Sequence, residues 1–140
     1  MAFWDASAIV PLCCSQSATV QGRRLRRELK RMVVWWGTPL EARSAFARLV
    51  RDGELTADER VAAVRLLVQL RAAWDEILPT EKVRSLAEDL PDAHGLRAAD
   101  AAQLAAALVW CRERPKRRPL VCFDERLRAA ATALGFSVRP

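Results

Sequence analysis

Four acidic residues stand apart from the other carboxylates of this 140-residue chain because of the segments around them: Asp5, Glu41, Asp100 and Asp124. Carboxylate oxygens are the ligands that hard divalent cations such as Mg²⁺ and Mn²⁺ prefer in proteins. Ions held in this way offset the repulsion among the carboxylates, bind a phosphate oxygen and activate a water molecule. Such a site needs no cysteine or histidine nucleophile, and the chain has a single histidine, in a turn-like segment.

Two of these acids follow segments with the composition of buried strands. Asp5 comes directly after the apolar residues 2–4, and Asp124 comes after Leu-Val-Cys-Phe at 120–123. In an open parallel sheet, ligands bind beyond the carboxyl ends of the strands, so both carboxylates are placed for a site there. Aspartate is also a favoured N-cap, and each of the two precedes a predicted helix, so capping is the alternative explanation.

The other two acids lie in predicted helices. Asp100 belongs to the segment AADAAQLAAALVWC, in which only Asp100 and Gln103 are polar, so this helix is expected to be buried nearly all round. A buried carboxylate is costly unless it is paired or bound to a metal ion. Glu41 follows Thr38 and Pro39 at the spacing of a capping box with Thr38 as the N-cap, so capping explains this glutamate as well as metal binding does.

The hydrophobic pattern alternates between strand-like and helix-like segments. We expect strands at 1–4, 32–36, 76–78, 120–123 and 136–138, and helices at 7–12, 17–31, 38–51, 56–74, 80–89, 98–111 and 124–134. This alternation indicates an α/β fold in which helices cover both faces of a central, mostly parallel sheet. No linker or repeat interrupts it, so residues 1–140 are expected to form one domain with four or five short strands.

The composition favours a cytoplasmic protein with a polyanionic partner. The net charge is +6, and exposed basic residues are expected at 112–118 and on the helix that carries Arg23, Arg24 and Arg27. These arginines could contact an RNA backbone or an acidic protein. The chain lacks the ~18 consecutive apolar residues that span a bilayer and the basic start of a signal peptide, so no membrane association or export is expected. The four cysteines match no usual zinc spacing and are expected to stay reduced.

Four segments together resemble a known family over nearly the whole chain. They are FWDASAIVPL at 3–12, TPLEARSAFARL at 38–49, LRAADAAQLAAAL at 96–108 and VCFDERLRAAATALGF at 121–136. In their order and spacing, these segments resemble the PIN-domain endoribonucleases of the VapC toxin type, from bacterial or archaeal toxin–antitoxin pairs. Two positions depart from similar sequences. Gln103 stands where a histidine is common, and Phe123 where a small hydroxyl residue precedes the last acid.

The resemblance implies a three-layer PIN-like fold and a metal-dependent ribonuclease that hydrolyses RNA with Mg²⁺ or Mn²⁺. It implies that Asp5, Glu41, Asp100 and Asp124 are the catalytic, metal-binding residues, and that Ser7 supports them by hydrogen bonding. It also implies two protein partners: a small antitoxin that covers the active-site groove, and a second copy of the chain in a homodimer.

One other function is consistent with the sequence, and two further ones require residues that the sequence lacks. A PIN-like domain that binds RNA or a protein without catalysis would keep the same fold. A haloacid-dehalogenase-like phosphatase would require a second aspartate two residues after the first, and Ser7 occupies that position. A receiver domain would require an acidic pair near the first strand and a lysine late in the chain, and neither is evident.

Overall fold

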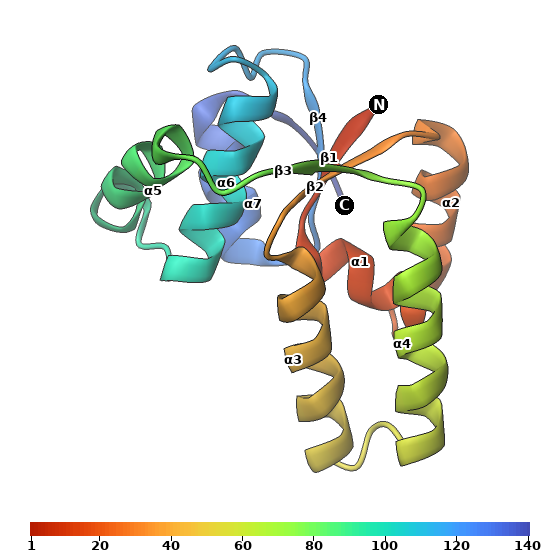
Figure 1. Cartoon of the computed structure of the whole chain (residues 1–140). Coiled ribbons are helices and arrows are strands. Elements are labelled where there is room, and N and C mark those ends of the chain that lie inside the picture. The colour runs from red at the N-terminus through yellow and green to blue at the C-terminus, as the bar shows by residue number, and fades with distance from the viewer.

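Five short parallel strands form the centre of the protein, whose computed structural model describes all 140 residues (Figure 1). The strands are β1 (Ala2–Trp4), β2 (Met32–Trp35), β3 (Asp75–Ile77), β4 (Pro119–Val121) and β5 (Ser137–Arg139). Their order in the sheet is β3-β2-β1-β4-β5, and all four neighbouring pairs are parallel. The chain therefore fills one half of the sheet outward from β1, then returns to start the other half at β4.

Seven helices cover the two faces of this sheet. They are α1 (Ala6–Cys13), α2 (Thr19–Leu29), α3 (Thr38–Arg51), α4 (Ala57–Arg71), α5 (Glu81–His94), α6 (Ala98–Trp110) and α7 (Glu125–Leu134). Helices α1 to α4 pack on one face and α5 to α7 on the other (Figure 1). Helices α3 and α4 lie side by side as a pair that extends beyond the sheet (Figure 1). The predicted three-layer α/β fold is confirmed.

The strands divide their side chains between two hydrophobic cores because successive residues of a strand point to opposite faces. In β1, Ala2 and Trp4 join the core beneath α1 to α4, whereas Phe3 joins the core beneath α5 to α7. In β4, Val121 and Leu120 divide in the same way. Both faces of the central strands are thus buried, which explains why their sequences are apolar throughout instead of alternating with polar residues.

Several helix ends differ from the sequence-based expectation. The first helix does not stop near Pro11 but continues to Cys13, and α5 continues through Pro91 to His94 instead of ending near 89. Tertiary packing holds these turns although each proline lacks the N–H that the helix would use. A capping box is present at Thr56, with Glu59 as its partner, and Gly135 ends α7 in the left-handed conformation at φ 101°.

All four cysteines are free thiols, as expected. None of the helices has the length and apolar character required to cross a lipid bilayer.

We expect Leu104→Ala to lower the free energy of unfolding by roughly 2–5 kcal/mol, because it opens a cavity in a closely packed core. Leu104 lies on α6 with 0% of its surface exposed. Leu40→Ala removes the same atoms from a side chain that is 74% exposed, so its effect should stay within about 0.5 kcal/mol. Urea denaturation of both variants measures the difference. Similar losses in the two variants would contradict the packing described above.

Candidate active site

The candidate site lies beyond the carboxyl ends of β1 and β4, at the point where the order in which the chain adds strands to the sheet reverses. These two strands are neighbours, although more than a hundred residues separate them in the sequence. The helices that follow them, α1 and α7, leave toward opposite faces of the sheet, which opens a crevice between them. Asp5 follows β1 and Asp124 caps the helix after β4, so the topology brings both acids to this crevice.

Asp5 is the most deeply buried of the four acids, with 4% of its surface exposed. It is the N-cap of α1, where its Oδ2 accepts a hydrogen bond of 2.9 Å from the backbone N–H of Ser7. The Cys122 thiol donates to the same oxygen at 3.5 Å. Burial raises the pKa of Asp5 above its usual value, and the hydrogen bonds from Ser7 and Cys122 oppose this rise. The capping role and the strand-end position therefore coexist in one residue.

Ser7 links the start of α1 to the segment that carries Asp124. Its Oγ accepts hydrogen bonds from the backbone N–H groups of Phe123 at 2.9 Å and Asp124 at 3.2 Å. The Cys122 sulfur lies 3.5 Å from the same oxygen. These bonds fix the β4–α7 connection against the first turn of α1. Ser7 thus has the hydrogen-bonding position expected of it, while its part in a reaction remains a prediction.

Asp124 is the N-cap of α7, and its Oδ1 accepts a hydrogen bond of 2.8 Å from the backbone N–H of Leu127. Its side chain is exposed, in contrast to that of Asp5. In both Asp5 and Asp124, the capping hydrogen bond uses one carboxylate oxygen and leaves the other oxygen out of the cap.

Glu41 does not cap its helix, so the predicted capping box at Thr38 is wrong. Helix α3 starts one residue earlier than that motif requires, with Gly37 as the N-cap and no side-chain capping bond. The Thr38 side chain is fully buried. Both side chains instead accept hydrogen bonds from the Nε2 of Gln103 on α6, at 3.1 Å to Thr38 Oγ1 and 3.1 Å to Glu41 Oε1.

The surroundings of Glu41 disfavour its negative charge. Burial, the charge of Asp5 and the charge of Asp100 raise the pKa of Glu41 from its usual 4.5 to about 7, and the Gln103 hydrogen bond opposes the rise. Glu41 is half-buried. Because two other carboxylates contribute to the shift, Glu41 lies within electrostatic reach of both.

Asp100 is half-buried in the first turn of α6. Burial and the charge of Asp124 raise its pKa, while the guanidinium groups of Arg97 and Arg126 act in the opposite direction. Asp100 is thus less buried than the apolar sequence of α6 predicts, because it lines the cavity at the start of that helix.

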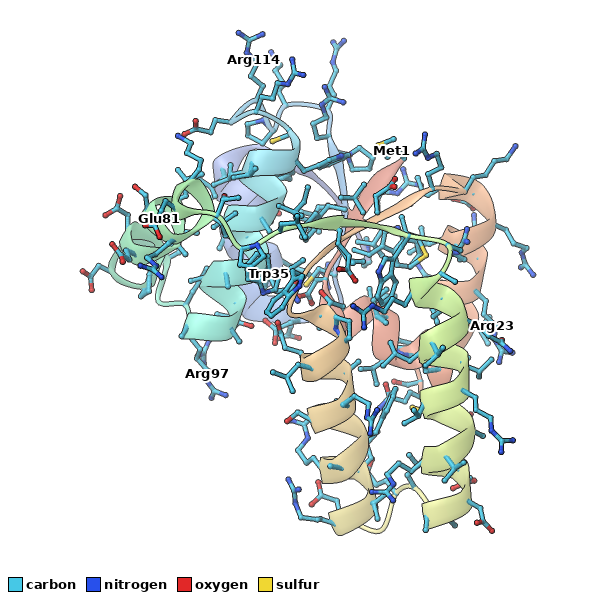
Figure 2. The ribbon with its side chains drawn as sticks, viewed as in Figure 1. Met1, Arg23, Trp35, Glu81, Arg97 and Arg114 are labelled. Atoms are coloured by element: carbon cyan, nitrogen blue, oxygen red, sulfur yellow. The ribbon has the colours of Figure 1, made fainter.

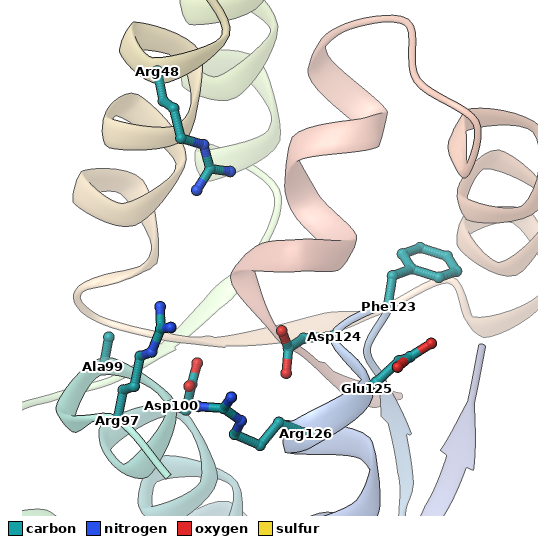
Figure 3. Close-up of a pocket in the computed structure, with 8 residues that line it drawn as sticks. All are labelled: Arg48, Arg97, Ala99, Asp100, Phe123, Asp124, Glu125 and Arg126. Carbon is teal, nitrogen blue, oxygen red and sulfur yellow. The ribbon is translucent and has the colours of Figure 1, made fainter. Parts of the chain in front are cut away.

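The four carboxylates gather in one region but do not line one cavity. Asp100 and Asp124 line a cavity of about 830 Å³ (Figure 3). Glu41 lines an adjoining cavity of about 520 Å³, together with Ser7, and the two cavities share Arg48, Arg97 and Ala99. Asp5 lines neither cavity, but its charge acts on Glu41. In this arrangement, no three Asp, Glu, His or Cys side chains are close enough to hold a metal ion together.

The types of these ligands nevertheless fit a hard divalent cation. All four offer carboxylate oxygens, which Mg²⁺ and Mn²⁺ prefer. Three of the four have pKa values raised in part or wholly by burial, so a positive charge among them would favour the ionised forms that bind metal. Convergence on an ion requires movement of side chains, for which the exposed Asp124 and half-buried Asp100 and Glu41 have room.

The sequence reasoning placed a basic contact surface on α2, and the structure keeps it apart from the carboxylates. Arg23, Arg24 and Arg27 are exposed and line neither of the two cavities. Figure 2 shows Arg23 and Arg97 on opposite sides of the α3–α4 pair. The arginines that do line the larger cavity are Arg48, Arg97 and Arg126. Two of them are close in sequence to a candidate acid: Arg126 follows Asp124 by two residues, and Arg97 precedes Asp100 by three.

Gln103 contacts one of the acids, although the sequence marked it only as a polar residue of an apolar helix and as a departure from similar sequences. It lies three residues after Asp100, on the same side of α6, and is the only other polar residue in that helix. That spacing was the available signal. Its amide joins α6 to α3 beside the acids, and its Oε1 is buried without a hydrogen-bond partner.

Comparison with known proteins adds no identification. No protein-family model matches this chain, and no curated protein sequence matches it either.

We expect Gln103→Met to raise the pKa of Glu41 above about 7, because the variant removes the hydrogen bond that favours the carboxylate. Carbon-13 NMR titration of the Glu41 carboxyl group measures the change directly. Thr38→Val is the matched control, since it removes the other acceptor of Gln103 and leaves the bond to Glu41 in place. A pKa for Glu41 that is unchanged or lower in Gln103→Met would show that the amide does not hold this carboxylate.

The raised pKa of Glu41 also predicts a pH dependence of stability in metal-free buffer. The folded protein holds the Glu41 proton up to a pH of about 7, whereas the unfolded chain releases it near 4.5. The contribution of Glu41 is therefore fully present below 4.5 and is lost as the pH rises through about 7. We expect Glu41→Gln to become progressively more stable than wild type across this interval.

Urea denaturation between pH 4 and 8 tests this expectation. The control is Glu88→Gln on the exposed face of α5, whose difference from wild type should not grow with pH. A Glu41→Gln variant that loses stability relative to wild type as the pH rises would contradict the assigned direction.

Proposed function

We propose that this protein is a metal-dependent ribonuclease of the PIN-domain type that hydrolyses RNA phosphodiester bonds. The observation that carries the proposal is the electrostatic linkage of the four carboxylates beyond the carboxyl ends of β1 and β4. Asp5 and Asp100 each raise the pKa of Glu41, and Asp124 raises the pKa of Asp100. Four different segments of the chain contribute these acids, and an ordinary fold gains no stability by gathering like charges in partly buried positions.

Asp5, Glu41, Asp100 and Asp124 are the residues proposed to hold Mg²⁺ or Mn²⁺. When bound, such an ion neutralises charge on a scissile phosphate and activates a water molecule for attack on phosphorus. Asp5 offers a rigid ligand, since the Ser7 N–H and the Cys122 thiol both hold its Oδ2. Gln103 orients Glu41, and Ser7 positions the backbone of Asp124.

The resemblance to VapC toxins adds a cellular role and protein partners to this proposal. We infer a role as the toxin of a toxin–antitoxin pair, with a small antitoxin protein and a second copy of the chain as partners. The net charge of +6 supports a polyanionic substrate such as RNA. These partners rest on the resemblance of the four sequence segments and not on a feature of the structure.

A second candidate is a PIN-like module that binds RNA or protein without catalysis. The observation in its favour is that no three potential ligands are arranged to hold a metal ion. Arg97 and Arg126 also place positive charge near Asp100, where a catalytic site would place a cation.

Incubation of the purified protein with RNA separates the two candidates. We expect cleavage with Mg²⁺ or Mn²⁺ that stops on addition of EDTA. Asp5→Asn and Asp100→Asn should each lose more activity than the roughly 10- to 100-fold that follows loss of an outer partner of a metal ligand. Asp89→Asn, on the exposed surface of α5, is the matched control and should keep full activity.

Undiminished cleavage by both Asp5→Asn and Asp100→Asn would contradict the assignment of the active site to these residues. Binding of RNA without cleavage in either metal ion would instead favour the non-catalytic module.

A further inference from the structure

Three arginines surround the cavity that contains Asp100 and Asp124. Arg48 comes from the middle of α3, Arg97 directly precedes α6, and Arg126 lies in the first turn of α7. Figure 3 shows their guanidinium groups directed toward the space around the two carboxylates. Arg48 and Arg97 also line the adjoining cavity that contains Glu41. The arginines thus border the two cavities that contain Glu41, Asp100 and Asp124, although they come from three separate elements.

None of these three guanidinium groups forms an ion pair. The six ion pairs of the protein involve other cations, including Arg24 with Glu28 at 2.9 Å on α2 and Arg31 with Asp75 at 3.0 Å. Arg97 and Arg126 act on Asp100 through their charge without forming such a contact. The donors of the three cavity arginines are therefore available to a ligand, whereas Arg24 is already engaged.

Guanidinium groups that form no ion pair within the protein are suited to binding phosphate. The planar fork of donors matches two phosphate oxygens, and it stays charged at any pH at which the protein is folded. Arg97 and Arg126 also lie at the amino-terminal ends of α6 and α7, where the helix dipole adds to the attraction for an anion. An RNA strand carries one phosphate per nucleotide, so it can supply a separate phosphate to each of the three cations.

We propose that Arg48, Arg97 and Arg126 bind successive phosphates of an RNA strand on either side of the carboxylates, and that this binding requires no metal ion. The choice of RNA rests on the function proposed above. The two carboxylates that line the cavity repel phosphate, so the strand is held by the arginines. The exposed arginines of α2, which line neither cavity, are not part of this site.

Salt dependence of RNA binding tests the assignment. Binding of a fluorescein-labelled single-stranded oligoribonucleotide to the full chain is measured by anisotropy in EDTA, at several salt concentrations. Each phosphate contact on a single strand contributes about 0.7 to the slope of log K against log salt. We therefore expect the triple variant Arg48→Gln, Arg97→Gln, Arg126→Gln to lower the slope by about 2 and to weaken binding.

The matched control is the triple variant Arg23→Gln, Arg24→Gln, Arg27→Gln, which removes the same net charge from α2. It should keep the wild-type slope, because its arginines lie outside the cavity. All six substituted side chains are exposed, so neither variant changes the core. Thermal unfolding of both variants checks that the fold is retained. Replacement of the cavity arginines by lysine, which keeps the charge, provides a second variant that should restore most of the slope.

Three results would overturn the proposal. These are an unchanged slope in the cavity variant, a slope lost only in the α2 variant, and equal losses in both, which would mean that net charge alone binds RNA. Since the assay contains no metal ion, it is independent of catalysis. Cavity-dependent binding by a protein that never cleaves RNA would uphold this site and contradict the ribonuclease, and cleavage with no dependence on the cavity arginines would do the reverse.

Discussion

Water solvates three of the four carboxylates of the candidate site poorly, and the local structure is arranged around the free energy that their charges cost. Asp5 is nearly inaccessible and Glu41 and Asp100 are half-buried, so burial raises the pKa of all three. Hydrogen-bond donors compensate in part: the Ser7 amide and Cys122 thiol at Asp5, and the Gln103 amide at Glu41. These donors come from different elements, so the same bonds that offset the charge also join α1, α3, α6 and the β4–α7 connection.

The Gln103 amide shows how this arrangement connects the two layers of helices. Gln103 belongs to the helix layer of α5 to α7, whereas Thr38 and Glu41 begin α3 in the opposite layer. Its Nε2 is shared by two acceptors, and its Oε1 is buried without a partner. A buried polar atom without a partner costs roughly 1–3 kcal/mol, which a residue retained only for packing would not incur. The position is better explained by the need to orient Glu41.

Positive charge is distributed in two different ways on this protein. The arginines of α2 face solvent at a distance from the crevice, and one of them is paired with Glu28. Arg48, Arg97 and Arg126 surround the carboxylates without ion pairs, so the cavity contains both signs of charge. Such a cavity suits a ligand that is itself mixed, with phosphates that attract arginine and a metal ion that attracts carboxylate. The proposed ribonuclease function uses the carboxylates of this cavity, and the proposed phosphate contacts use its arginines.

The sequence by itself determined the elements and the layers, because both depend on short-range patterns. Each of these patterns involves residues that are close in the sequence. Examples are the apolar strands, the helix starts at Thr56 and Thr80, and the helix end at Gly135. The positions of Asp5 and Asp124 after strands followed from the same patterns. Once the strands are parallel and neighbouring, their carboxyl ends must meet at one edge of the sheet.

Only the tertiary structure decided what each side chain does there. Thr38 and Glu41 have the spacing of a capping box, yet burial of Thr38 and the distant amide of Gln103 direct both side chains elsewhere. The three arginines of the cavity share no sequence pattern, since α3, α6 and α7 bring them together only when they pack on the sheet. Competition between a local hydrogen bond and a distant partner is settled by burial, and burial is a property of the folded chain.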